Sequence, residues 1–168
     1  MKVHASPENY VLRAATPADA PAIARHRVSM FRDMGMLDGW DAAALEAGSH
    51  AHLSTALADG TYRGWLIAYD NVVVAGAGVI LRPLLPRPES PHGGEDAEVL
   101  NVYTDPAHRR RGLARRLVEH VLSWSRARGF RRISLHASDE GRPLYEQLGF
   151  EPTNEMRREL KADERQRS

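Results

Sequence analysis

The 168-residue sequence contains no cysteine. The chain therefore has no means of forming a disulfide, using a catalytic thiolate or binding a metal through thiolates. It also lacks any run of about 18 apolar residues, the length that a membrane-crossing helix needs. The first ten residues, MKVHASPENY, lack the apolar core of a secretory signal. These absences predict a cytoplasmic protein that has no membrane partner. Any catalysis must use side chains other than cysteine.

Metal ligands are also few, although the sequence has eight histidines. Only His50 and His52 are close in sequence, and residues two apart on a helix do not share a face. We therefore expect no bound metal. His136 is interpreted as a packing residue on an expected strand, with contact to a substrate as the alternative.

Positive charge is concentrated in one segment, although the formal net charge is only +1. Residues 109–132 contain nine arginines and a single acidic residue, Glu119. This pattern predicts a positive face, and guanidinium groups form forked hydrogen bonds with phosphate. A GC-rich genome would produce the same arginine bias, so composition alone does not establish an anion site.

The residue patterns predict a single domain over residues 1–168, with a core over about 10–160 and a charged tail over 161–168. Helical spacing begins at Thr16, with Pro17 and Asp19 as start signals, and recurs over 41–58, 112–128 and 141–148. Strand patterns cover 11–15, 62–69, 72–82, 97–104, 131–138 and the residues from Phe150 onward, with a hairpin turn at Asp70-Asn71. Four prolines and two glycines predict an exposed loop over 83–96. This order of elements indicates an α/β or α+β fold.

The segment Arg109-Arg110-Arg111-Gly112-Leu113-Ala114 lies between an expected strand and an expected helix. The start of a helix leaves about four N–H groups without internal partners and carries a partial positive charge. Gly112 lets a ligand approach the backbone closely, and Ala114 leaves the first helical turn uncovered. The segment is therefore typical of an anion site, particularly for a diphosphate.

These six residues resemble the R/Q-x-x-G-x-G/A motif of the GNAT acyl-CoA N-acyltransferases, and LYEQLGF at 144–150 resembles a second motif of that family. The resemblance covers about residues 10–160 and is specific over 97–150. It implies a central mixed, mostly antiparallel sheet of about six or seven strands with helices on both faces. A splayed parallel pair is expected at residues 98–104 and 131–137.

The resemblance also implies that acetyl-CoA is the cosubstrate. The residues expected to bind it lie along one strand, in the following loop and at one later position: Val102, Tyr103, Thr104, Arg109, Arg110, Arg111, Gly112, Leu113, Ala114, Arg115 and Ser138. Ser138 and Gly141 depart from the asparagine and alanine that many family members carry at these places. We expect Ser138 to replace only part of the asparagine's contact.

Two residues are expected to catalyse acetyl transfer to a primary amine in a ternary complex. Tyr145 resembles the general acid that protonates coenzyme A as it leaves, and a packed tyrosine is the alternative. Glu98 resembles a glutamate base of histone-type members. A solvent-facing carboxylate at the start of a strand is the alternative for Glu98.

The acceptor site is expected between the first two helices. Phe31 and Met34, with Met36 and Trp40, form an apolar set that fits either a pocket or plain core. Asn101 resembles an asparagine of protein N-terminal acetyltransferases, although a structural role is equally open. If this region lines the pocket, Arg27 and Arg32 favour an acceptor that carries a carboxylate or phosphate.

Two other functions are alternatives to acetyl transfer. One is a non-catalytic sensor of the same fold that binds acyl-CoA. The other is an arginine-rich nucleic-acid binder, which the lack of exposed aromatics among the arginines disfavours; we expect no nucleic-acid partner. The sequence does not determine the oligomeric state, although the resemblance allows a homodimer.

Overall fold

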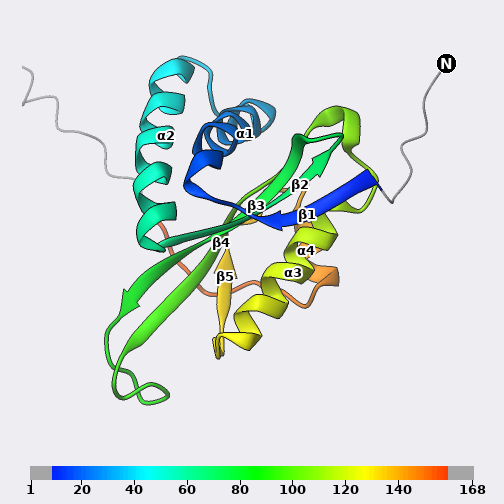
Figure 1. The fold of residues 1–168 in the computed structure, drawn as a ribbon. Coiled ribbons are helices and arrows are strands. Elements are labelled where there is room, and N and C mark those ends of the chain that lie inside the picture. The colour runs from blue at the N-terminus through cyan, green and yellow to red at the C-terminus, as the bar shows by residue number, and fades with distance from the viewer. Residues whose placement is uncertain (1–8, 159–168) are drawn as a thin grey trace, which may run out of the picture.

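The computed structural model describes residues 9–158, which pack around one five-stranded sheet (Figure 1). The strands lie in chain order: β1 (Tyr10–Ala14), β2 (Tyr62–Tyr69), β3 (Val72–Leu84), β4 (Gly94–Thr104) and β5 (Ile133–Leu135). The first four strands pair antiparallel, and β5 pairs parallel with β4. The predicted mixed, mostly antiparallel sheet is confirmed, with five strands in the described residues instead of six or seven.

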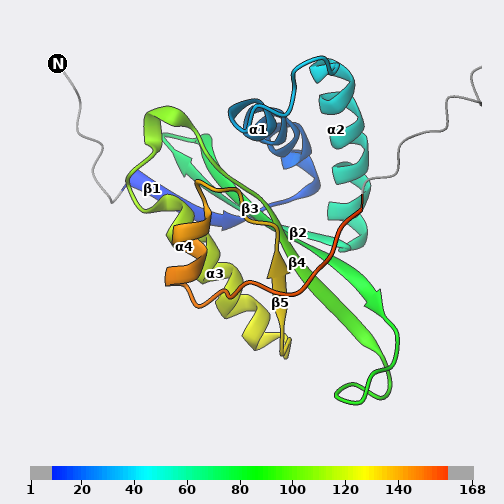
Figure 2. The ribbon, with the colours of Figure 1, turned by 180° about the vertical axis from the view of Figure 1, so that it is seen from behind.

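Up to residue 158, where the described part of the chain ends, the strand expected from Phe150 onward is not formed, which explains part of that difference. Residues 151–158 are irregular and exposed. They include Pro152 and lack the alternating apolar residues that would give a strand a buried face. Figure 2 shows this segment passing β5 after the last helix. The predicted tail at 161–168 lies outside the described residues.

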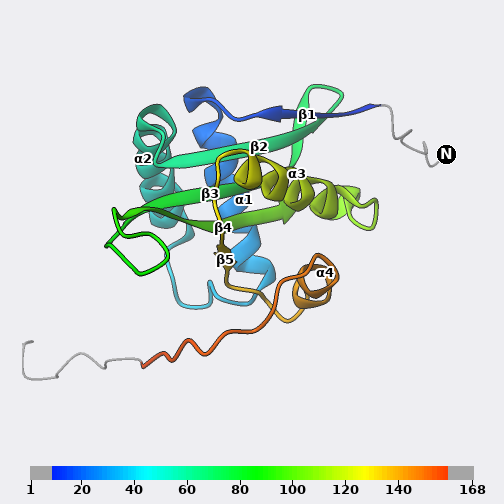
Figure 3. The same cartoon turned by 90° about the horizontal axis from the view of Figure 1, so that it is seen from below.

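Helices cover both faces of the sheet, as predicted (Figure 3). They are α1 (Ala20–Asp33), α2 (Ala42–Asp59), α3 (Leu113–Ala127) and α4 (Arg142–Gln147). α1 and α2 pack on one face around Ile23, Leu57 and Leu66. α3 packs on the other face through Leu117 and Val121. No helix in the described part of the chain is long and apolar enough to cross a membrane.

The start of the first helix uses the predicted residues with a tighter turn. Pro17–Asp19 form a 3-10 turn before α1, and the Asp19 carboxylate accepts a hydrogen bond from the Thr16 N–H at 2.8 Å. Arg13 donates two hydrogen bonds to the same carboxylate, at 2.8 and 2.7 Å. The Arg13 guanidinium lowers the pKa of Asp19 to about 2.

The two predicted breaks between strands have different outcomes. Asp70 and Asn71 have φ of 48° and 64° and form the expected hairpin turn between β2 and β3. The loop expected over 83–96 is shorter, because Pro83 pairs with Glu95 and β4 begins at Gly94. At the far end of this hairpin, Pro83 can occupy a strand position that needs no N–H donor.

A bulge interrupts β4 where the sheet opens. β4 and β5 form only three residue pairs, ending at Val99 and Leu135. Two residues further along β4, Asn101 has a φ of 55°, and the register with β3 shifts beside it. The extra residue of a bulge bends the strand. β4 therefore continues to Thr104 without β5 beside it, which is the splayed parallel pair that the sequence predicted.

Candidate functional site

The arginine-rich loop leads from β4 to the start of α3. Arg110 and Gly112 adopt the left-handed conformation, with φ of 61° and 75°. The Arg116 N–H donates a hydrogen bond to the Gly112 carbonyl. In the described residues, none of the N–H groups of residues 111–115 donates to an acceptor. The loop thus gathers free donors at the positive end of a helix, the arrangement that binds anions.

Only some arginines of this segment are available to a ligand. Arg109 donates to the Thr104 carbonyl at 2.9 Å and pairs with Asp33 at the end of α1. Arg115 donates to Gln147 of α4. Arg116 donates to the Tyr10 carbonyl at 2.9 Å. Arg110 and Arg111 are exposed and lack a carboxylate partner among residues 9–158. The loop is therefore tied down by some of its arginines and presents others to solvent.

The edge of β4 beyond Val99 runs toward this loop. Val102 packs on the α3 face, whereas the Tyr103 ring lies on the α1 face, 5.0 Å from the ring of His26. Within residues 9–158, no strand pairs with residues 100–104 on the side where β5 has left the sheet. Unpaired backbone groups of this kind can accept an extended chain as an added strand.

α4 holds the second motif and is joined to the start of α3 by the hydrogen bond from Arg115 to Gln147. The Tyr145 ring packs against Phe150, 5.8 Å between centroids, and burial raises the pKa of Tyr145. A Cβ at Gly141 would lie 3.0 Å from Tyr145 Cε2 and 3.2 Å from Ser138 Oγ. The glycine therefore admits a tyrosine position that an alanine would press against. Ser138 Oγ accepts the Gly141 N–H at 3.1 Å and keeps its own proton to donate.

Glu98 projects from β4 near the last pair with β5. One carboxylate oxygen lies 2.7 Å from Arg82 Nη2, and the other lies 2.9 Å from His136 Nδ1. The second nitrogen of His136 lies 3.4 Å from Glu155. Glu98 is largely shielded, with 18% of its side chain exposed. Its carboxylate is therefore held by two side chains and faces solvent only in part.

The acceptor candidates separate into two groups. Arg27 donates to the Asn101 side-chain oxygen at 2.7 Å, and its guanidinium carbon lies 4.8 Å from the Phe31 ring centre. Phe31, Arg27 and Asn101 are thus brought together beside the bulge. Met34, Met36 and Trp40 lie after α1 with 44%, 53% and 77% of their surface exposed. They are not core residues, and Arg32 is also exposed.

Sequence reasoning missed three partners in this region. Arg82 holds Glu98, His136 contacts Glu98, and the buried Tyr62 hydroxyl accepts the Asn101 amide at 3.2 Å. Burial raises the pKa of Tyr62 to about 12. The strand patterns placed Glu98 and His136 in the two strands of the expected parallel pair. This was the one sign in the sequence that the two side chains could be neighbours. The register that joins them was not readable from the sequence.

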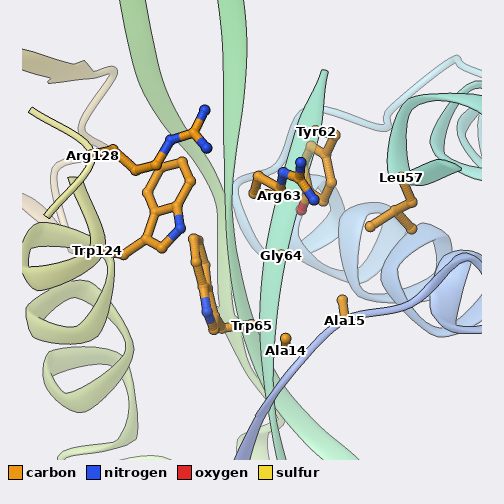
Figure 4. A pocket seen from close by; sticks show the side chains of 9 residues that line it. All are labelled: Ala14, Ala15, Leu57, Tyr62, Arg63, Gly64, Trp65, Trp124 and Arg128. Carbon is orange, nitrogen blue, oxygen red and sulfur yellow. The ribbon is translucent and has the colours of Figure 1, made fainter. Parts of the chain in front are cut away.

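A separate groove of about 400 Å³ lies at the opposite end of α3 (Figure 4). It is lined by Ala14, Ala15, Leu57, Tyr62, Arg63, Gly64, Trp65, Trp124 and Arg128. Because α3 is about 20 Å long, this groove is remote from the loop at 109–114. We place the candidate site at the open edge of β4 and the loop with the free donors, to which α4 is joined through Arg115 and Gln147.

Residues 26–150 match the acetyltransferase (GNAT) family. An uncharacterized N-acetyltransferase of Escherichia coli (strain K12) is 28% identical over 151 residues, covering 87% of this chain and 84% of its own. A GCN5-related N-acetyltransferase from Ralstonia eutropha JMP134 has a TM-score of 0.80 at 33% identity, covering 90% of this chain and 98% of its own.

A predicted acetyltransferase from Clostridium acetobutylicum, solved with acetyl-CoA, also has a TM-score of 0.80. It is 24% identical and covers 90% of this chain and 96% of its own, so this likeness shows the fold alone. The matched family segment includes β4, the loop, α3 and α4, which together form the candidate site. The chain therefore belongs to the acetyltransferase (GNAT) family.

Proposed function

We propose that the protein transfers an acetyl group from acetyl-CoA directly to a primary amine. The observation that carries this proposal is the pairing of two features: free N–H groups at 111–115 and an unpaired edge of β4 leading to them. A diphosphate can accept hydrogen bonds from the free N–H groups, and an extended chain with amide groups can pair with the edge of β4. The Clostridium acetobutylicum protein of the same fold was solved with acetyl-CoA, which adds support.

The binding residues divide into backbone and side-chain donors. We assign the diphosphate to the backbone of Gly112, Leu113, Ala114 and their neighbours, with the charges of Arg110 and Arg111 around it. Arg109 and Arg115 hold the loop through Asp33 and Gln147 and contribute charge from a distance. Val102, Tyr103 and Thr104 offer backbone groups along the open edge, and Ser138 offers its hydroxyl proton.

Two proton transfers accompany the reaction. Bound acetyl-CoA supplies an activated acyl group and a thiol leaving group. Tyr145 donates its phenolic proton to the departing sulfur, and the raised pKa keeps that proton in place at neutral pH. Glu98 accepts the proton of the amine, and Arg82 and His136 hold its carboxylate in place.

The direct test is release of free coenzyme A thiol from acetyl-CoA with a panel of amines. We expect release above the amine-free rate with at least one amine class, and a higher melting temperature with coenzyme A. A native-state ligand at about 100 times its Kd adds about 2.7 kcal/mol. Stabilisation without thiol release would instead support the sensor. Stabilisation by an oligonucleotide, and none by millimolar coenzyme A, would contradict the proposal.

The same assay examines the proposed base. Glu98→Gln keeps the size of the side chain and removes its charge, so we expect kcat to fall by about 100-fold. Stabilisation by coenzyme A should be unchanged, because Glu98 lies away from the loop at 109–114. Full kcat in Glu98→Gln would show that the proton leaves by another route, such as water.

A further inference from the structure

Arg27 lies against the bulge of β4 and differs from several other arginines in having no acidic partner among residues 9–158. It lies in α1 with a half-buried side chain, and one Nη donates to Asn101 at 2.7 Å. Among residues 9–158 no carboxylate forms a salt bridge with it. Arg13, Arg82 and Arg109 each pair with an acidic side chain. Arg27 is thus a partly buried cation without a counter-charge in the described structure.

The surroundings of Arg27 do not provide that counter-charge. Asn101 and Tyr62 are neutral hydrogen-bonding groups, and Phe31 offers the face of its ring at 4.8 Å. Glu98, on the neighbouring part of β4, has both carboxylate oxygens on Arg82 and His136. Burial lowers the pKa of Arg27, which is the electrostatic sign of a cation kept from water.

The position of Arg27 relates it to the transferred group. Asn101 lies at the bulge, two residues past the last pair between β4 and β5. If the diphosphate lies at 111–115 and the pantetheine arm runs back along β4, its thioester end reaches the bulge. Arg27 approaches that point from the α1 face, opposite the face that α3 covers. In that arrangement the cofactor's phosphates would lie beyond Thr104, at the other end of this strand segment.

We propose that Arg27 selects an amine acceptor that also carries an anionic oxygen group, either a carboxylate or a phosphate. This inference rests on the proposed acetyl transfer and names the class of its acceptor. Of the five N–H donors of a guanidinium group, one is used by Asn101, and the remaining fork suits a carboxylate or phosphate. An anion bound there completes the charge balance of the site, and Asn101 fixes the direction of the fork.

The test compares matched acceptors in the thiol-release assay at saturating acetyl-CoA. The pairs are amino acids with their amides, and O-phosphoethanolamine with ethanolamine. We expect the anionic member of at least one pair to have a kcat/KM roughly 10- to 100-fold higher. The amino acid pairs report on a carboxylate, and the ethanolamine pair reports on a phosphate.

Variants of one helix then assign this preference to Arg27. Arg27→Met is expected to lose the preference for the anionic member, mainly through KM, while the neutral member changes by less than about threefold. Arg27→Lys keeps the charge without the fork and should retain part of the preference. Arg25→Met, which removes an exposed arginine of the same helix, should retain all of it. Melting temperatures verify that each variant is folded. If Arg27→Met does not fold, the preference measured for Arg27→Lys serves as the test.

Two results would overturn the inference and leave acetyl transfer intact. One is equal use of the neutral and anionic members by the native protein. The other is a preference that survives in Arg27→Met. Absence of thiol release with every acceptor would instead contradict the proposed function, and the inference would fall with it.

Discussion

Replacing Ala114 with glutamate is expected to raise the Kd for coenzyme A by about 100-fold without destabilising the protein. Ala114 lies in the first turn of α3, among the free N–H groups of residues 111–115. Like charges about 5 Å apart repel by about 3 kcal/mol at an effective dielectric constant of about 20, which corresponds to about 100-fold in affinity. An acid in the first turn of a helix stabilises that helix by about 0.3–1 kcal/mol. The variant should therefore melt at the same or a higher temperature.

Two controls separate charge from size in this experiment. Ala114→Gln adds a side chain of similar size without charge and should weaken binding much less. Ser123→Glu adds the same charge at an exposed position near the other end of α3 and should leave the Kd unchanged. Calorimetric titration with coenzyme A gives each Kd. Native affinity in Ala114→Glu would remove the diphosphate from the start of α3.

Removing one hydroxyl, in Tyr145→Phe, is expected to lower kcat by about 100-fold. The phenylalanine ring keeps the packing against Phe150 and the close approach to Gly141. The Kd for coenzyme A should therefore be unchanged. The measurement is kcat for thiol release at saturating acetyl-CoA with the best amine of the panel. A variant that keeps the native kcat would exclude Tyr145 as the acid.

The pH dependence of kcat in the native protein examines the same residue. An ordinary tyrosine loses its proton at a pH of about 10. Burial raises the pKa of Tyr145, so its protonated, acid form persists to a still higher pH. We expect no loss of kcat from this group as the pH rises from neutral to about 10. Tyr69→Phe, which removes a hydroxyl from β2, is the matched control and should keep the native kcat.

Local patterns predicted the elements that carry the site. The apolar spacing of Leu113, Leu117 and Val121 predicted α3, and Gly112 marked its start. The Asp70-Asn71 turn set the hairpin of β2 and β3. Each of these features depends on residues that are close in sequence, because helix starts and tight turns are determined by neighbouring side chains. The position of the loop at 109–114, between a strand and the start of a helix, was readable for this reason.

Long-range partners were not readable in the same way. Arg109 pairs with Asp33, which is 76 residues away in the sequence. This contact directs the Arg109 side chain toward the end of α1. Asn101 occupies a left-handed position at a bulge, which the alternation of LNVYT does not reveal. The partners of Glu98 depend on the register of three strands. Such contacts follow from how the sheet closes, and the sequence alone does not fix that geometry.

The candidate acceptor residues show the same difference between local patterns, which were readable, and long-range contacts, which were not. The sequence placed Phe31, Met34 and Trp40 in one apolar group. The structure keeps Phe31 beside Arg27 and leaves Trp40 exposed on the segment after α1. The end of α1 at Asp33 causes this separation, because the residues beyond it no longer follow the helical face. The acceptor class that we propose therefore rests on the charge of Arg27 and not on the apolar residues.

Amide NMR of the 18.7 kDa chain during titration with coenzyme A tests the central claim most directly. If the backbone N–H groups at the start of α3 bind the diphosphate, the amide signals of residues 111–115 should move downfield and saturate. Signals of residues 102–104 should move with them, because the same molecule lies along β4. No shift at millimolar coenzyme A, or shifts confined to the groove lined by Trp65 and Trp124 at the opposite end of α3, would contradict the account.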